Sequence, residues 1–318
     1  MTRVADRSAA PSLDRLRIGL RVVLGGASLV FVAYALFGLV ERWDASQIAL
    51  SWGLLLLSVV PLALGVVLLA LSWKWLLEGM TSRSIPTGAA VALHFESQLA
   101  RYTPGKVGVP LVRIAGAPQL GVAAGPIGSS VVIELLPYLS VGAGTGLFCL
   151  WLASSHLDGA LAAIGRWGVW GLGAFTAVTL VLLLLDRRRY PAAVLKLLRL
   201  EGEGPLVPPR VPLAHAGYWL TWALHGYLTS LAVGATSDAA FASAGIYVIA
   251  PVAGFLALIT PAGVGVREAV ASVALAPVIG AAPAVAAAIL SRFTSLVVDV
   301  VAWAIGRAVS RRSQRPSR

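Results

Sequence analysis

The sequence predicts an all-α polytopic membrane protein, and three observations support that fold class. Hydrophobic residues make up 58% of the 318 residues, charged residues only 12%, and the mean hydropathy is +0.84. An average soluble domain carries about 25% charged residues. Several apolar stretches reach the roughly 20 residues that cross a bilayer as a helix. A membrane β-barrel would show short segments of alternating hydrophobicity instead.

Six apolar stretches are expected to be full spans. In chain order they are 22–40, 50–73, 127–152, 161–185, 213–235 and 284–306. The first follows a basic tail at 1–21 and shows no small-residue cleavage site, so we interpret it as a retained helix. Two further helical stretches, 87–122 and 240–279, contain glycine and proline phrases that break a helix.

The 25 Lys and Arg residues are distributed unevenly between the two sides of the predicted spans. Most lie on one side, in the tails 1–21 and 307–318, the loop 186–212 and the connection after the second span. The opposite side has Arg42 and Arg166. Because cytoplasmic loops collect Lys and Arg, we expect a multi-pass protein of the cell membrane with both termini in the cytoplasm. The net charge of +11 is then explained by topology, and no nucleic-acid partner is expected.

A short phrase occurs twice, as TPGKVGVP from Thr103 and as TPAGVGV from Thr260. A shift of 157 residues aligns the two phrases, and the same shift places Glu134 on Ser291. The order of span, span, broken stretch and span occurs in both halves of the chain. Because each half would cross the membrane three times, the halves have opposite orientations. The sequence therefore predicts an inverted repeat with discontinuous helices, an architecture of secondary transporters.

The two halves are 22–152 and 153–306, and each contains one broken stretch, 87–122 or 240–279. We expect each broken stretch to be a re-entrant hairpin, because irregular backbone at membrane depth is tolerated where it is buried in protein or lines a cavity. The alternative is two ordinary pairs of helices, which gives eight full spans. The expected hairpin tips are Pro104, Gly105, Gly108, Pro261, Gly263 and Gly265.

Ionisable residues within the apolar stretches are the candidate functional residues, since an unpaired charge there is costly. The expected substrate-binding residues are Arg101, Lys106, Arg113, Glu134, Arg267, Glu268 and Arg292. We expect Glu134 to pair with Arg292. Asp299 is a candidate proton carrier, or the counter-charge of Arg292, which lies two turns earlier on the same helix face. No catalytic triad, phosphate-binding loop or metal-ligand spacing occurs, so we expect no catalytic residue, metal or cofactor.

Several motifs resemble the lysylphosphatidylglycerol synthase transmembrane (flippase-like) family over nearly the whole chain. They are RYTPGKVGVPLVRIAGAPQLGV, SSVVIELL and TPAGVGVREAVASVALAPVIGAAPAVAAAILSRF. The matching positions are Arg101, Tyr102, Pro104, Gly105, Gly108, Arg113, Glu134, Pro261, Gly263, Gly265, Arg267, Glu268 and Arg292. One position departs from the family pattern, because Leu135 stands where the family usually has an arginine.

The resemblance implies an integral membrane module that translocates lipids, with the substrate unspecified. Because Arg113, Arg267 and Arg292 could neutralise a phosphate, we expect a lipid translocase that moves a polar, anionic lipid or lipid-linked headgroup between leaflets. The implied partners are a membrane lipid as substrate and a lipid-modifying enzyme. Two alternatives are a membrane-embedded lipid-phosphate transferase with Glu134 as general base, and a non-transporting membrane subunit of a lipid synthase.

Overall fold

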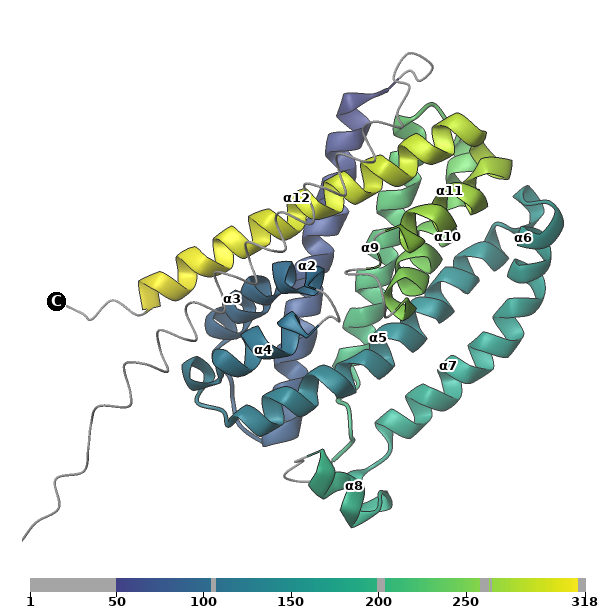
Figure 1. The fold of residues 1–318 in the computed structure, drawn as a ribbon. Helices are drawn as coiled ribbons and strands as arrows, with labels where there is room; N and C mark the ends of the chain where they lie inside the picture. The colour runs from purple at the N-terminus through teal and green to yellow at the C-terminus, as the bar shows by residue number, and fades with distance from the viewer. Residues whose placement is uncertain (1–49, 104–106, 199–203, 258–262, 264, 314–318) are drawn as a thin grey trace, which may run out of the picture.

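The computed structural model describes residues 50–103, 107–198, 204–257, 263 and 265–313 (Figure 1). These residues are mostly helical, and no β-strand occurs among them. The predicted first span and the tail before it lie outside the described residues. So do three predicted residues of the hairpin tips, Pro104, Gly105 and Pro261, and the predicted substrate-binding residue Lys106.

The described part of the chain contains five helices that are long and apolar enough to cross a membrane. They are α2 (Trp52–Thr81), α5 (Ala124–Leu152), the continuous α6 and α7 (Gly159–Leu184), α10 (Ser237–Leu256) and α12 (Ala281–Ser313). α9 (Arg210–Ala232) has 23 residues but is less apolar, and its buried face carries two histidines. The all-α polytopic fold class is therefore confirmed.

The first broken stretch forms a hairpin of short helices. α3 (Thr87–Gln98) continues as a 3-10 turn (Leu99–Tyr102), and α4 (Gly108–Ala115) returns to a second 3-10 turn (Ala117–Leu120). α3 has 12 residues, about 18 Å at the helical rise, so it is too short to cross the hydrocarbon layer. α4 packs against both α3 and α5.

The second broken stretch pairs α10 with the shorter α11 (Val266–Ile279), and the two helices pack side by side (Figure 1). α10 has 20 residues and meets the length and hydropathy of a span, unlike α3. The re-entrant form of the second hairpin stays a prediction, with two full spans as the alternative.

The helix starts recur at nearly the spacing of the sequence repeat. α5 begins at Ala124 and α12 at Ala281, which are 157 residues apart. α4 and α11 begin at Gly108 and Val266, one residue further apart. α2 and α9 likewise begin 158 residues apart. Corresponding helices of the two halves thus start in the same register, whereas the opposed orientation of the halves stays a prediction.

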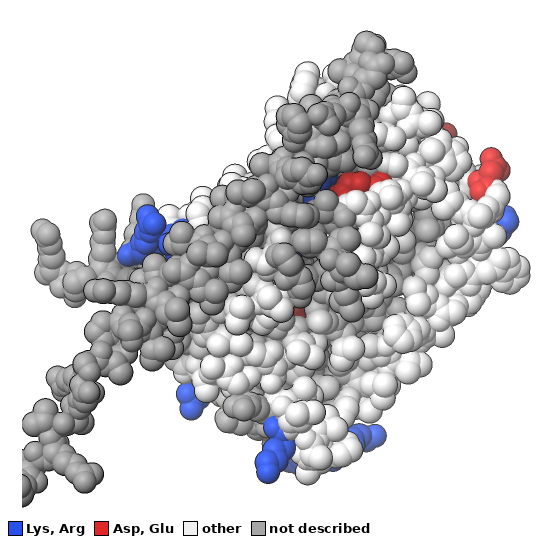
Figure 2. Space-filling model, in the orientation of Figure 1, with Lys and Arg blue, Asp and Glu red and all other residues white. Residues whose placement is uncertain are grey.

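The packing encloses α9, while α7 lies at the periphery (Figure 1). α2 packs along α9, α12 lies against α3 and α11, and α5 lies between α7 and α10. The side chains of Trp167 and Trp170 at the start of the α7 segment are 74% and 71% exposed. Figure 2 shows Lys and Arg side chains mainly at the margins of this face, at the bottom, left and right, and mostly uncharged residues between them. Exposed large hydrophobic residues such as Val178 and Val181 on α7 agree with a bundle that exposes apolar residues to lipid.

α10 approaches α5 closely because Gly245 has no side chain. A Cβ atom added at Gly245 would lie 2.7 Å from the carbonyl oxygen of Gly146 and 2.9 Å from the backbone nitrogen of Leu150. Both atoms belong to the backbone of α5, so rotation of a side chain cannot relieve the contact. Small residues at such crossings allow membrane helices to pack by dispersion forces.

We predict that Gly245→Ala destabilises the bundle by about 1–3 kcal/mol, because the added methyl group forces α10 away from α5. The matched control is Gly171→Ala on α7, where no atom lies within 4 Å of the added Cβ. The apparent melting temperature of the detergent-purified protein measures both effects. Equal melting temperatures for the two variants would contradict the close contact.

Candidate functional site

A cavity of about 430 Å³ lies in the bundle between both hairpins and the long helices α2, α5, α9 and α12. Four arginines and two carboxylates contribute to its wall: Arg101, Arg113, Arg267, Arg292, Glu134 and Asp299. Five of the seven predicted substrate-binding residues are thus brought together at one cavity. Of the other two, Glu268 is buried outside the lining and Lys106 lies outside the described residues.

Arg113 on α4 has a complete set of partners and is only 4% exposed. Its Nη1 donates to Glu134 Oε2 at 2.6 Å, and its Nε donates to Ser97 Oγ at 3.2 Å. Its Nη2 donates to His94 Nδ1 at 2.9 Å, and its guanidinium lies 4.5 Å from the ring centre of Trp73. Arg113 is therefore buried among fixed partners and does not extend to the membrane surface.

The predicted pairing of Glu134 with Arg292 is wrong. Glu134 on α5 pairs with Arg113, because α4 packs directly against α5. Arg292 on α12 instead lies beside Glu268 of the adjacent α11, with 3.6 Å between Arg292 Nε and Glu268 Oε1.

Glu268 also closes the start of α11. Its Oε2 accepts a hydrogen bond of 2.7 Å from the backbone nitrogen of Gly265, one of the predicted tip residues. Gly265 has φ +85, a left-handed conformation that favours glycine. A glutamate at this position satisfies a free N–H group at the helix start. The helix cap and the ion pair with Arg292 therefore share one carboxylate.

Asp299 connects the two halves of the chain. Its Oδ1 accepts from Arg101 Nη2 at 3.0 Å, and its Oδ2 accepts from the Tyr102 hydroxyl at 2.8 Å. The expectation that Asp299 balances Arg292 is therefore wrong. Seven residues correspond to a rise of about 10 Å along the helix, which leaves the two side chains on one face but too far apart to pair.

Arg267 on α11 is the exception among the four arginines. Its Nη2 donates to Ser291 Oγ at 2.9 Å, and its Nη1 donates to Ser295 Oγ at 3.3 Å. Its guanidinium lies 4.6 Å from the ring centre of Trp222. Among the described residues, no carboxylate oxygen lies within 4.0 Å of its nitrogens. Arg267 is 8% exposed, so among the described residues a nearly buried positive charge has no carboxylate in direct contact.

The described residues beside the first hairpin tip hold the backbone tightly. Thr103 Oγ1 donates to the carbonyl oxygen of Ala100 at 2.8 Å and accepts from the backbone nitrogen of Gly108 at 3.1 Å. A Cβ atom at Gly108 would lie 2.4 Å from the Ala100 carbonyl oxygen. In the second hairpin, Gly263 approaches the backbone of Gly254 in the same way. Glycines at both tips therefore allow close backbone contact.

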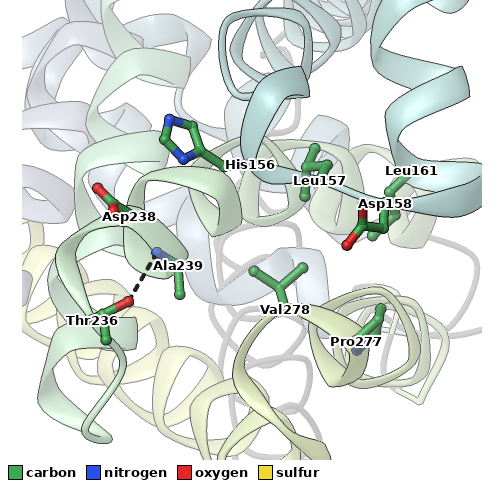
Figure 3. Close-up of a pocket in the computed structure, with 9 residues that line it drawn as sticks. All are labelled: His156, Leu157, Asp158, Leu161, Thr236, Asp238, Ala239, Pro277 and Val278. Atoms are coloured by element: carbon green, nitrogen blue, oxygen red, sulfur yellow. Dashed lines mark hydrogen bonds between the residues drawn. The ribbon is translucent and has the colours of Figure 1, made fainter.

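A second, smaller pocket of about 260 Å³ has the opposite charge character (Figure 3). His156 and Asp158 from the α5–α6 connection line it together with Asp238 at the start of α10. Thr236 accepts from the backbone nitrogen of Ala239 and caps α10. No Lys or Arg lines this pocket. Of the two pockets, only the central cavity is therefore lined by arginines. Nor do the described residues contain a group of three or more His, Cys, Asp or Glu side chains that could hold a metal.

Two residues at the central cavity were not predicted from the sequence. Trp222 on α9 lines the cavity and stacks on Arg267, and His225 lies one turn further along α9 in contact with Ser291. The position of His225 within an apolar stretch is the one sequence signal that could have identified it.

We predict that Glu134→Gln destabilises the protein by about 3–5 kcal/mol, because it leaves the buried Arg113 charge without its counter-charge. The double variant Arg113→Met, Glu134→Leu removes both charges and should regain most of that loss. Apparent melting temperatures of the two variants measure the difference. A double variant less stable than Glu134→Gln would show that the pair is not the source of the effect.

Comparison with known proteins gives one assignment. No curated protein sequence matches the chain. The family described as "Lysylphosphatidylglycerol synthase TM region" matches residues 18–302, which include both hairpins and every cavity-lining arginine. The match covers most of the chain and confirms the resemblance seen in the sequence motifs. The chain therefore belongs to the lysylphosphatidylglycerol synthase TM region family.

Proposed function

We propose that the protein is a lipid translocase whose central cavity holds an anionic headgroup while the lipid moves between leaflets. The observation that carries the proposal is the charge balance of the cavity. Glu134, Asp299 and Glu268 lie beside three of the four arginines, and Arg267 has only hydroxyl and aromatic partners among the described residues. A buried arginine in a membrane domain is costly unless it is paired or solvated. A ligand anion would complete this site.

The remaining walls of the cavity suit the apolar part of a lipid. The apolar lining includes Leu62, Val66 and Leu69 of α2 and Phe255 of α10. Pockets that combine apolar walls with a few placed polar groups are typical of small-molecule sites. The family assignment and the membrane helices support an integral membrane protein linked to lipid metabolism, and translocation is our proposal beyond that.

The two hairpins are proposed to act as gates of an inverted repeat. In the first half, an arginine on α4 pairs with a carboxylate on α5. In the second half, a carboxylate on α11 lies beside an arginine on α12. Each pair joins the second helix of a hairpin to the long helix that follows it, with the charges exchanged. The recurring helix starts support the repeat. Opening either pair would loosen one hairpin at a time, as alternating access requires.

Asp299 is proposed as the residue that couples movement to protons. It holds both Arg101 and Tyr102 at the tip end of the first hairpin. Protonation of its carboxylate would weaken the ion pair and release that end of the hairpin from α12. The predicted orientation, with both termini in the cytoplasm, and a lipid-modifying enzyme as partner are parts of the same proposal. The transferase alternative is not favoured, because Glu134 is held by Arg113 and is poorly placed to act as a base.

Exchange of a labelled lipid in proteoliposomes tests the proposed function. We predict that purified protein accelerates dithionite-accessible exchange of a fluorescent phosphodiester lipid, and that Arg267→Gln and Arg292→Gln each reduce the rate about tenfold or more, since each removes a charge-assisted contact. The control is Arg83→Gln, an exposed residue on the connection after α2. Unchanged exchange in both cavity variants would refute the proposal, as would product formation in place of exchange.

A second measurement addresses coupling. We predict that a pH gradient across the vesicle membrane stimulates exchange in the wild-type protein, and that Asp299→Asn abolishes this stimulation while exchange without a gradient persists. Glu96→Gln is the matched control, because Glu96 is also buried on a helix that packs against α12 but does not line the cavity. Equal stimulation of Asp299→Asn and wild type would remove Asp299 from the proposed mechanism.

A further inference from the structure

Arg113 and Arg267 lie in closely similar surroundings. Each comes from the second helix of a hairpin and stacks over a tryptophan, at 4.5 Å from Trp73 and 4.6 Å from Trp222. Each also donates to at least one serine hydroxyl. The two arginines occupy the same helix face of corresponding helices, because a shift of 157 residues places Arg267 three residues, or about one turn, before Arg113.

The two surroundings differ in one partner. The shift that aligns the start of α5 with the start of α12 also places Glu134 on Ser291. Arg113 donates to the carboxylate of Glu134 at 2.6 Å, and Arg267 donates to the hydroxyl of Ser291 at 2.9 Å. The second half therefore has a neutral hydroxyl where the first half has a carboxylate.

The hydroxyl hydrogen of Ser291 is already used in a hydrogen bond to His225. His225 Nδ1 lies 3.0 Å from the carbonyl oxygen of Ser58, which can only accept, so Nδ1 carries the ring proton. His225 Nε2 is then an acceptor, and it lies 2.9 Å from Ser291 Oγ. Ser291 must therefore donate to His225 and accept from Arg267. This chain of hydrogen bonds fixes the guanidinium without supplying a negative charge.

Ser295 acts in the same way on the other side of the guanidinium. Its hydroxyl donates to the carbonyl oxygen of Arg292 at 2.9 Å and accepts from Arg267 Nη1 at 3.3 Å. Both serines thus hold Arg267 in place while neither hydroxyl proton is available to a ligand. Arg267 and Ser295 line the cavity, whereas Ser291 and His225 lie behind it.

We infer that Arg267 forms a single-anion subsite, in which one oxyanion of the ligand, bound from the cavity side, supplies the negative charge that the Glu134 carboxylate supplies beside Arg113. Ser291 and His225 are positioning residues for this subsite. The inference rests on the proposed function and specifies it, because one uncompensated arginine matches one negative charge on the headgroup. A phosphodiester and a carboxylate share that chemistry, and a guanidinium binds either through paired N–H groups.

An isosteric pair of variants tests the subsite without transport. Ser291→Asp places a carboxylate beside Arg267, and Ser291→Asn has the same shape without the charge. The probe is dihexyl phosphate, and its binding to the detergent-purified protein is followed by the quenching of tryptophan fluorescence. Octanoate in a parallel titration distinguishes a phosphodiester site from a carboxylate site. We expect Ser291→Asp to bind the preferred probe at least about tenfold more weakly than Ser291→Asn, because its own carboxylate already neutralises Arg267. Equal affinities would overturn the inference.

The positioning role has a separate test, which also applies if neither isosteric variant folds. Ser291→Ala breaks the connection from His225 to Arg267, and Ser291→Thr keeps the hydroxyl. We expect Ser291→Ala to raise the lipid concentration at half-maximal exchange about tenfold with little change in the maximal rate, and Ser291→Thr to restore the wild-type value. A loss of maximal rate alone, or a failure of threonine to restore affinity, would contradict positioning.

The two assays separate this inference from the proposed function. Arg267→Gln is compared with wild type in both the binding assay and the exchange assay. Exchange that depends on Arg267 together with probe binding that does not depend on it would overturn the subsite and leave translocation standing. Probe binding that follows the Ser291 variants, in a protein that exchanges no lipid, would support the subsite and overturn translocation.

Discussion

The placement of four arginine side chains in one apolar bundle, three of them buried and Arg101 partly exposed, is the constraint on which the rest of the structure depends. Each guanidinium needs partners supplied by the protein itself, because the surrounding lipid offers none. α12 supplies partners for two of them and carries a third. Asp299 holds Arg101, Ser291 and Ser295 hold Arg267, and Arg292 itself comes from this helix. The long last helix therefore organises the cavity. It contacts the first hairpin through Asp299 and Arg101, and the second hairpin through Ser291 and Arg267.

The short helices of the hairpins follow from the same constraint. A helix that starts inside the bundle can place an arginine at the cavity, one or two turns from its first residue. A continuous span offers no helix end at that depth. Arg113 lies in the last turn of α4, and Arg267 lies in the first turn of α11. The glycines at the tips permit these starts, since Gly108 and Gly263 each approach neighbouring backbone closely.

Much of this arrangement could be predicted from the sequence, because its signals are local. Hydropathy located the long helices, glycine and proline located the hairpins, and charge within apolar stretches identified the residues that line the cavity.

The pairing of those residues could not be predicted. Helical periodicity shows that Arg292 and Asp299 share a face, but it does not show which helix lies opposite that face. The approach of α4 to α5 assigns Glu134 to Arg113, and only tertiary packing sets that approach. His225 was missed for the same reason, since its role depends on Ser58 and Ser291 from two other helices.

The asymmetry between the two halves explains why a repeat is useful here. If both halves carried a carboxylate beside their arginine, both positive charges would already be neutralised and the cavity would not attract an anion. If neither did, two buried charges would have to be compensated by the ligand. One paired arginine beside one that is held only by hydroxyls gives a site that is structurally complete and short of a single negative charge. A carboxylate at position 291 would stabilise Arg267 more strongly than serine does. Serine at position 291 therefore leaves the unliganded protein less stable, and a ligand anion bound at Arg267 can restore that stability.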